Sequence, residues 1–321
     1  MSFPYESEVK TEIPTLQREA FNDATFTYMK WPSNLKKQES KTKTNTTDGK
    51  DEQVITKCRV LIVHGFCEYY KIYYKLMDNL ALNGVESFMF DQRGSGDTSP
   101  GKERGKTDEV ATFADLNHFI EMNLKECEPV DRKLFLFGHS MGGGIVLNYG
   151  CNGKYKDKIA GIITTGPLIE LHPNSRPNFI LRCLAPALAI VLPRFTIDTA
   201  LNVDGITSDE EYKELLRTDP KLKLTGSFKQ IYDMLERGKK LVNDPYVAKT
   251  FNSPLLIMHG KADTINDPDS SEKFVNERLP QVEDKTVKIY QDAKHSLLSI
   301  EVDSVFQEPF KDMIDWINAH V

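Results

Sequence analysis

Short apolar runs alternate with amphipathic stretches along most of this chain, and this alternation constrains the fold more than any other feature. The runs have the length and composition of buried strands: 59–63 (RVLIV), 85–90, 133–137 (KLFLF), 159–164, 254–258 (PLLIM) and 287–290. The stretches between them, such as 108–124, carry apolar residues mostly at three- and four-residue intervals, which is typical of helices with one buried face. Strands that alternate with helices form a mostly parallel sheet with helices on both faces. The sequence therefore predicts an α/β fold.

The alternation is interrupted after residue 167. Residues 168–247 show no clear strand pattern and consist of apolar and charged helical stretches broken by prolines. We interpret this segment as a helical cap or lid, inserted into a core made of residues 1–167 and 248–321. Near the start of the chain, 21–31 has the mixed composition of a strand or hairpin, and 33–53 is almost entirely polar, which predicts a solvated loop.

Composition limits the class of partner. The 321 residues carry a formal net charge of −6, which disfavours nucleic acid because phosphate binding requires a basic surface. The five cysteines are an odd number without CxxC spacing, a pattern that fits neither a zinc site nor a disulfide framework. The first residues lack the apolar stretch of a signal peptide, and no run reaches the roughly 20 apolar residues of a membrane span. We therefore expect an intracellular protein.

The segment 138–142 (GHSMG) carries the strongest chemical signal. It directly follows an apolar strand and directly precedes a helix, which is the context of a nucleophile elbow, a sharp turn that lifts a serine hydroxyl above the sheet edge. Glycines flank the serine because the turn brings backbone segments too close for side chains. The structural alternative is a glycine-rich helix start with a capping serine. We predict that Ser140 is a nucleophile and that the chain has the α/β-hydrolase fold.

A serine nucleophile needs a base, and the base needs an acid to orient it. Among the seven histidines, His295 follows the last predicted strand near the C-terminus, where the third member of the Ser–Asp–His order belongs. For the acid, Asp263 follows the strand 254–258 at its carboxyl end, where α/β sheets gather their chemistry. The competitors are Asp267, which is placed to start the next helix, and Asp292, which is too close to His295 in sequence to reach its ring. We favour Asp263.

Two backbone amides are expected to stabilise the oxyanion of the tetrahedral intermediate. One belongs to Met141, the residue after the nucleophile, and the other is expected in the loop 64–66 (HGF), with the amide of Phe66 as the best candidate. A tight strand exit is the structural alternative for this loop. The glycine-rich cluster that follows the next strand lacks the order of a phosphate-binding loop. We interpret its Asp91 and Arg93 as a structural pair that shapes the loop beside the site.

Taken together, these motifs resemble those of the monoglyceride lipases, most closely the fungal, yeast-type enzymes. The matching segments are HGFCEY (64–69), FDQRGSGDTSPG (90–101), FGHSMGGG (137–144), HGKADTIND (259–267) and KIYQDAKHS (288–296), with GPLIELHP (166–173), IDTALNVDGITSDEEY (197–212) and GSFKQIYDMLERGKKL (226–241) in the cap. The resemblance covers essentially the whole chain outside 33–53. One departure is Cys67, where relatives usually carry glycine and where a thiol would narrow the site or sensitise it to thiol reagents.

The resemblance implies a serine hydrolase with a mobile helical cap that cleaves monoacylglycerols to fatty acid and glycerol, without a cofactor or a metal. It implies Ser140 as nucleophile, Asp263 as acid, His295 as base, and the amides of Phe66 and Met141 as oxyanion donors. It also implies a peripheral, cytoplasmic attachment to lipid droplets or to the membrane of the endoplasmic reticulum.

The cap by itself also favours a lipid substrate. Residues 183–192 (CLAPALAIVL) form an apolar stretch between Arg182 and Arg194 that is too short to span a bilayer. Such a stretch either lines a buried pocket or lies in a lipid interface with the arginines at the headgroups, and both arrangements supply an apolar acyl site. A lysophospholipase or a general carboxylesterase would use the same triad. A non-catalytic binding protein on this scaffold is disfavoured, because such proteins often lose a triad member.

Overall fold

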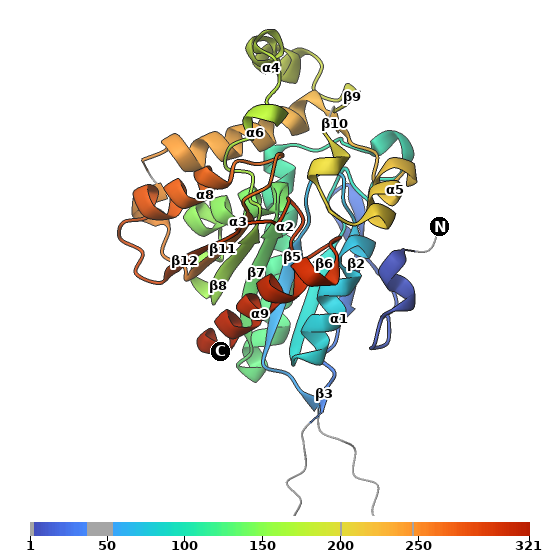
Figure 1. The fold of residues 1–321 in the computed structure, drawn as a ribbon, viewed down its shortest axis with the longest axis vertical. Coiled ribbons are helices and arrows are strands. Elements are labelled where there is room, and N and C mark those ends of the chain that lie inside the picture. Colours follow the sequence, from blue (N-terminus) through green and yellow to red (C-terminus); the bar gives the residue numbers. More distant parts are fainter. Residues whose placement is uncertain (1–2, 37–53, 200, 246) are drawn as a thin grey trace, which may run out of the picture.

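The computed structural model describes residues 3–36, 54–199, 201–245 and 247–321 (Figure 1). Within them, the largest sheet has eight strands in the order β1-β2-β6-β5-β7-β8-β11-β12. The strands are β1 Gln17–Phe21, β2 Ala24–Trp31, β6 Val85–Phe90, β5 Cys58–Val63, β7 Lys133–His139, β8 Gly161–Thr165, β11 Leu255–Gly260 and β12 Lys285–Tyr290. The β1–β2 and β2–β6 pairs are antiparallel, and the pairs from β6 to β12 are parallel. The predicted α/β-hydrolase fold, with its mostly parallel sheet, is confirmed.

Successive side chains of a strand point in opposite directions, so a mostly apolar strand makes both faces of the sheet apolar. In β5, Val60 and Ile62 belong to one buried cluster, while Leu61 and Val63 belong to the other. All residues of β5, β6 and β11 are buried, as expected for central strands that are covered on both sides. This is why these strands are mostly apolar and do not alternate between apolar and polar residues.

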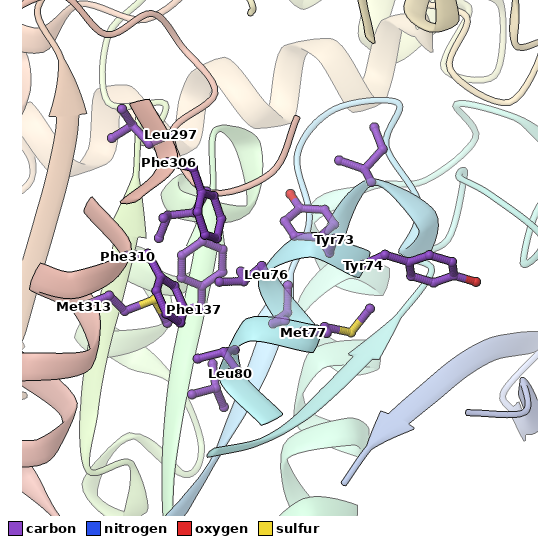
Figure 2. Packing of buried hydrophobic residues seen from close by; sticks show 14 of the residues in the cluster. Tyr73, Tyr74, Leu76, Met77, Leu80, Phe137, Leu297, Phe306, Phe310 and Met313 are labelled. Atoms are coloured by element: carbon purple, nitrogen blue, oxygen red, sulfur yellow. The ribbon is translucent and has the colours of Figure 1, made fainter. Parts of the chain in front are cut away.

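Helices cover the two faces of the sheet. They are α1 Tyr74–Leu82 and α9 Asp303–His320 on one face, and α2 Glu109–Cys127, α3 Met141–Asn152 and α8 Pro268–Lys273 on the other. Figure 2 shows the first face, where side chains of α1 and α9 converge over Phe137 of β7. The rings of Phe306 and Phe310 in α9 stack there with centroids 5.3 Å apart. Truncating either ring to alanine would destabilise the fold by about 3–5 kcal/mol.

The interval between β8 and β11 lies outside the large sheet. Its elements are α4 Phe179–Val191, β9 Thr196–Asp198, α5 Glu210–Thr218, β10 Thr225–Ser227, α6 Phe228–Asn243 and α7 Val247–Thr250. Figure 1 shows α4, α6, β9 and β10 gathered at one end of the sheet. We refer to this interval as the cap. The sequence analysis expected no strand here, yet β9 and β10 pair antiparallel over three residues each. Such short strands leave too little alternation to be recognised in a sequence.

The remaining expectations are met with small shifts. The strand or hairpin predicted over 21–31 is the turn and second strand of the β1–β2 hairpin, whose first strand begins earlier, at Gln17; Asn22 lies in the turn at φ 51°. The helix that Asp267 was expected to start is α8, which is followed by a π-helical turn, Phe274–Arg278. Most of the polar segment 33–53 lies outside the described residues, and β3 Leu35–Lys36 and β4 Val54–Ile55 pair beside it. No helix in the described ranges has both the length and the apolar character that crossing a bilayer requires.

Candidate active site

A sharp turn between β7 and α3 carries Ser140. This residue has φ 53° and ψ −116°, a conformation that costs of order 1–3 kcal/mol for a residue with a side chain. Its amide donates to the carbonyl of Thr165 in β8 at 3.0 Å, and its carbonyl accepts from the amide of Leu168 at 2.8 Å. A methyl group at Gly142 would lie 2.0 Å from the carbonyl oxygen of Val63, so only glycine fits there. The geometry is that of a nucleophile elbow.

Asp263 and His295 form a buried, hydrogen-bonded pair. Nδ1 of His295 lies 2.7 Å from Oδ2 of Asp263. The same Oδ2 lies 2.9 Å from Nε2 of His259, and Oδ1 accepts from the amides of Ile265 and Asn266 at 2.7 and 3.0 Å. These contacts hold the carboxylate in one orientation. Because Nδ1 of His295 donates to Asp263, its Nε2 is available to accept a proton.

The electrostatic balance favours the charged form of both groups. Burial would raise the pKa of Asp263, but the charge of His295 and hydrogen bonds from His259 and His295 outweigh burial and hold this pKa well below its ordinary value. Burial would likewise lower the pKa of His295, but the charge and hydrogen bond of Asp263, with a smaller contribution from Glu68, raise it above the ordinary value of 6.5. The pair therefore stabilises an imidazolium, which is the form that a general base acquires in acyl transfer.

The competing residues have other roles in the fold. Asp267 caps α8, as the sequence predicts, because its Oδ1 accepts an amide of the first turn at 3.1 Å. Asp292 is exposed. His64 accepts the amide of Gln92 on Nε2 at 2.9 Å, and burial lowers its pKa, so it is a neutral structural residue. His259 contacts the same oxygen of Asp263 as His295 does, and its Nδ1 lies 2.8 Å from the hydroxyl of Ser271.

The loop after β5, residues 64–67, is called the oxyanion loop below. The amides of its Phe66 and of Met141 have no hydrogen-bond acceptor within the described part of the chain. Both residues line the same cavity as Ser140. Met141 is also the first residue of α3, so its amide belongs to the positive end of the helix dipole. Both amides are therefore available to donate to a ligand in this cavity.

Glu68 is a buried carboxylate that the sequence analysis missed. Its Oε2 accepts from the amide of Gly65 at 2.6 Å and from the hydroxyl of Tyr73 at 2.6 Å, which fixes the oxyanion loop. Its Oε1 lies 3.6 Å from Nε2 of His139, whose ring centroid is 4.8 Å from that of His295. The carboxylate therefore connects the oxyanion loop with the surroundings of the base. The sequence did offer a signal for this role, since Glu68 is a charged residue three positions after Gly65, in the loop that follows a buried strand.

His139 is the residue directly before Ser140 in the elbow. The structure places its ring against His295, with Nδ1 2.9 Å from the hydroxyl of Thr165. Burial lowers the pKa of His139 to about 4, so the ring is neutral at physiological pH. A neutral ring in this position supports His295 sterically without adding a competing charge.

Cys67, the last residue of the oxyanion loop, contacts the cap. Its φ is 59°, a left-handed conformation that favours glycine, and its Sγ contacts the carbonyl of Thr225 in β10 at 3.3 Å. Burial raises the pKa of this thiol to about 12. The thiol is therefore protonated and directed to the cap, which disfavours the reactivity that the sequence suggested for it. Cys183 on α4, by contrast, is exposed.

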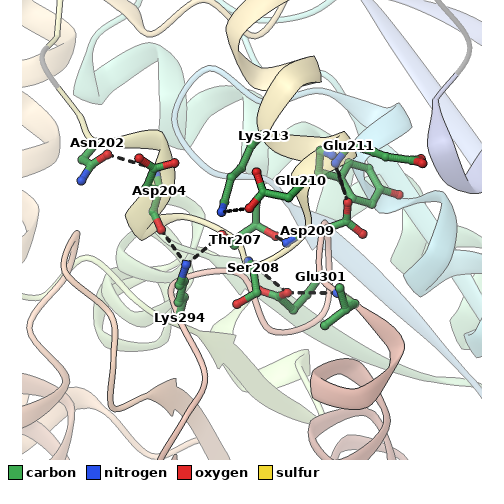
Figure 3. Close-up of polar contacts among 12 residues, drawn as sticks. Asn202, Asp204, Thr207, Ser208, Asp209, Glu210, Glu211, Lys213, Lys294 and Glu301 are labelled. Atoms are coloured by element: carbon green, nitrogen blue, oxygen red, sulfur yellow. Dashed lines mark hydrogen bonds and ion pairs between the residues drawn. The ribbon is translucent and has the colours of Figure 1, made fainter.

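The loop that carries His295 is bonded to the cap as well as to the core. Lys294 donates to the carbonyls of Asp204 and Thr207 at 2.8 and 3.3 Å, and Glu301 accepts the amide of Ser208 at 3.0 Å (Figure 3). The amide of Ser296, next to the histidine, donates to Ile206 at 2.8 Å. The first half of the cap therefore helps to fix the position of His295.

A cavity of 410 Å³ opens over Ser140 between the core and the cap. The apolar part of its wall is Phe66, Met141, Leu168, Leu171, Leu181, Ile197, Leu201, Ile231, Met234, Leu235 and Ile265. A second cavity of 370 Å³ lies between α4 and α6 and shares Leu168, Leu171 and Leu235 with the first. Apolar walls around a few polar groups are typical of a small-molecule site. In the described ranges, no cluster of three or more His, Cys, Asp or Glu side chains could hold a metal ion.

The predicted pair of Asp91 and Arg93 is wrong. Asp91 is buried, its two oxygens accept the amides of Tyr70 and Asp97 at 2.9 and 2.8 Å, and burial raises its pKa to about 7. Arg93 instead donates to both oxygens of Asp115 in α2 at 3.0 Å. The two side chains leave the strand end in different directions, and each shapes the loop separately.

Comparison with known proteins identifies the family. Residues 55–303 match the family model described as Serine aminopeptidase, S33 (Hydrolase_4). The chain is 49% identical over 322 residues to the monoglyceride lipase of Saccharomyces cerevisiae, an alignment that covers 99% of this chain and 97% of that enzyme. The chain belongs to the monoglyceride lipase family.

Other members of the monoglyceride lipase family agree with this assignment. The putative monoglyceride lipase of Schizosaccharomyces pombe is 36% identical, with 85% of this chain and 70% of that protein covered. A crystal structure of a soluble variant of the Saccharomyces cerevisiae monoglyceride lipase, in complex with a substrate analog, matches with a TM-score of 0.89 and 47% identity over 100% of this chain and 99% of that one. Family membership makes this chain an enzyme, a serine hydrolase of the α/β-hydrolase class.

Proposed function

We propose that this member of the monoglyceride lipase family hydrolyses the ester of a monoacylglycerol, with Ser140, Asp263 and His295 as its catalytic triad. The observation that carries the proposal is the apolar cavity that opens over Ser140 beside two amides without acceptors in the described chain. The similarity over nearly the full length to an enzyme named monoglyceride lipase supports the same substrate class.

The reaction proceeds in two halves. In the first, Nε2 of His295 takes the hydroxyl proton of Ser140 while Oγ attacks the ester carbonyl carbon. The carbonyl oxygen becomes an oxyanion that accepts hydrogen bonds from the amides of Phe66 and Met141, and Asp263 stabilises the imidazolium. When the intermediate collapses, the carbon–oxygen bond to glycerol breaks, and glycerol leaves with the proton of His295.

In the second half, water removes the acyl group. His295 takes a proton from water as its oxygen attacks the carbonyl carbon of the acyl-enzyme, and the same two amides hold the new oxyanion. The bond to Oγ of Ser140 then breaks, Oγ takes the proton back from His295, and the fatty acid is released. Both halves use only groups of this chain and water.

The cavity wall has an apolar region and a polar region, which match the acyl chain and the glycerol of the substrate. Its apolar residues from α4, α6 and β9 form a surface for an acyl chain. The polar side chains Asn174, Ser175, Asn178 and Asn266 lie in the same wall and can hydrogen-bond glycerol hydroxyls. A substrate with a long apolar chain and a small polyol matches both parts.

The exposed face of α4 supports contact with a lipid surface. Among the described side chains of α4, Ala189 alone is buried, while Phe179, Ile180, Ile190 and Val191 are 77, 70, 80 and 73% exposed. Contiguous exposed apolar side chains of this kind mark interaction sites. We infer that α4 lies in the interface of a lipid droplet or of the cytoplasmic face of the endoplasmic reticulum, and that the enzyme is a peripheral protein there.

The test measures release of fatty acid and glycerol from a long-chain monoacylglycerol dispersed in detergent, for the native chain and for Ser140→Ala. Diacylglycerol, a lysophospholipid and a water-soluble short-chain ester are assayed alongside. We expect the monoacylglycerol to be preferred and the variant to be at least about 10⁴-fold less active. Thermal unfolding shows whether the variant is folded. Full activity of the folded variant would overturn the triad, and preference for the lysophospholipid would overturn the substrate class.

A further inference from the structure

A second feature of the cap has no part in the ester hydrolysis: a basic cavity beside β9 and β10. Its volume is 440 Å³. The ionisable side chains in its wall are Lys102, Arg104, Lys221 and Lys223, and none of them is acidic. This concentration of positive charge occurs on a chain whose formal net charge is −6. We propose that this cavity binds the phosphate of an anionic phospholipid headgroup when α4 lies on a lipid surface.

Part of the positive charge in this basic cavity is not neutralised by the protein. Lys221 pairs with Asp97 at 2.6 Å, and Lys223 pairs with Asp198 at 2.9 Å. Arg104 donates to the backbone carbonyl of Lys221, which leaves its charge uncompensated. Neither Lys102 nor Arg104 has an acidic partner in the described part of the chain. The ammonium group of Lys102 and the guanidinium group of Arg104 therefore remain available to an external anion. The Lys223–Asp198 ion pair is exposed and therefore weak, so Asp198 competes little with that anion.

The basic cavity lies at the same end of the molecule as the apolar face of α4, and the chain that leaves α4 leads to it. Thr196 forms part of its wall, and the preceding residue, Phe195, is 57% exposed and stacks on Phe228 with centroids 5.6 Å apart. Arg194 reaches Glu103, the neighbour of Lys102, with a 2.8 Å ion pair. Figure 1 places β9 and β10 at the same end of the molecule as α4.

Because α4 and the basic cavity lie at the same end of the molecule, the depth of α4 in a lipid surface also sets the depth of the cavity. If the apolar residues of α4 enter the acyl region, side chains that follow the helix by a few residues lie among the headgroups. The chemistry that fits the cavity is a phosphate monoanion, and the lipid is the source that we assign, because the apolar face brings the surface to it. The inference rests on the proposed contact between α4 and lipid.

The test compares partition of the native protein onto vesicles of phosphatidylcholine alone and onto vesicles in which part of this lipid is replaced by phosphatidylglycerol. The variant is the double substitution Lys102→Gln and Arg104→Gln, which removes the two cations without an acidic partner. Each basic side chain near an anionic surface contributes about a fivefold gain in partition, so the variant should lose about 25-fold on the anionic vesicles and little on the neutral ones.

The matched control removes the same charge elsewhere, with Lys125→Gln and Lys311→Gln. These lysines are 73 and 76% exposed, and each pairs with an acid one helical turn away. We expect the control to bind anionic vesicles like the native protein. Three results would overturn the headgroup site: equal native partition onto both kinds of vesicle, an equal loss in the control, or an equal loss on both vesicles.

A further arm separates lipid from free phosphate. Inorganic phosphate is added at the ionic strength of a chloride reference, and thermal unfolding is followed. We expect no shift in Tm, and a rise in Tm that the double variant loses would assign the cavity to free phosphate instead. Hydrolysis of detergent-dispersed monoacylglycerol needs no vesicle, so equal partition onto both vesicles would remove the headgroup site and leave the proposed activity standing.

Discussion

The acid–base pair and helix α4 are organised in opposite ways. The carboxylate of Asp263 is buried and has contacts on both oxygens from His259, His295 and two backbone amides. Helix α4 exposes most of its apolar side chains and packs mainly on α6. The pair needs one fixed geometry, because Asp263 must hold the ring of His295 in the orientation that leaves Nε2 free to take a proton. The helix needs an apolar surface that the rest of the protein does not cover.

This contrast predicts where substitutions act. A change in the acid–base pair should abolish chemistry while leaving contact with lipid intact, and a change on α4 should do the reverse. The oxyanion loop lies between these extremes, because it contacts the core through Glu68 and the cap through Cys67.

The largest effect is expected for Asp263→Asn. Loss of the negative charge removes the stabilisation of the imidazolium and disturbs the ring orientation of His295, so kcat should fall by about 10⁴-fold. Hydrolysis of a water-soluble ester measures this without the complication of a lipid surface. The control is Asp267→Asn, which changes the cap of α8 and should cost at most about 1 kcal/mol of stability without loss of kcat. A decrease of less than tenfold in Asp263→Asn would contradict the assignment of the acid.

A smaller effect is expected for Glu68→Gln, about 10²-fold in kcat, because the amide cannot accept as strongly from Gly65 and Tyr73 and the oxyanion loop loosens. The pH profile separates this role from a purely structural one. In the native enzyme, activity should rise with pH through a midpoint above 6.5, since His295 acts as a base only when neutral and its pKa is raised.

The charge of Glu68 contributes to that raised pKa, so the midpoint should move to lower pH in Glu68→Gln. The reference is Tyr73→Phe, which loses one hydrogen bond to Glu68 but keeps its charge. If the midpoint of Glu68→Gln coincided with that of the native enzyme, Glu68 would act only as a structural residue.

On α4, the double substitution Ile190→Ser and Val191→Ser should weaken partition onto vesicles by at least about tenfold, because both side chains are mostly exposed and would transfer apolar surface into lipid. The free energy of unfolding should change by no more than about 1 kcal/mol, since exposed residues contribute little. Val130→Ser is the control: this valine is 60% exposed and follows the C-terminal end of α2. Unchanged partition of the α4 variant would exclude this helix as the contact with lipid.

Much of the core could be predicted from the sequence, because a parallel sheet covered on both faces produces uninterrupted apolar runs such as β5 and β11. The elbow was equally accessible, since its glycines and serine lie next to one another in the chain. Asp263 and His295 are far apart in sequence, and the order of strands placed them correctly relative to each other. Their roles in catalysis stay predictions.

The contacts of charged side chains could not be predicted in the same way. Arg93 has Asp91 two residues away, yet it pairs with Asp115, whose position on α2 depends on the packed fold. Glu68 stands close to a buried strand exit in the sequence, but its approach to His139 depends on the packed fold, and β9 and β10 pair across the whole of α5. In each case the partner is chosen by tertiary structure, so a reading of neighbours in the sequence misses it.

The smallest effect is expected for Cys67→Gly. Glycine relieves the strain of a left-handed residue, of order 1 kcal/mol, while loss of the buried thiol and its contact with Thr225 acts in the opposite direction. Stability and kcat should therefore stay close to native values. Iodoacetamide labelling followed by mass spectrometry gives the sharper test, because a buried thiol with a pKa of about 12 should react far more slowly than the exposed Cys183. Rapid labelling of Cys67 with loss of activity would show that the contact between the oxyanion loop and the cap opens readily. It would also weaken the contrast between a fixed active site and the exposed apolar surface of α4.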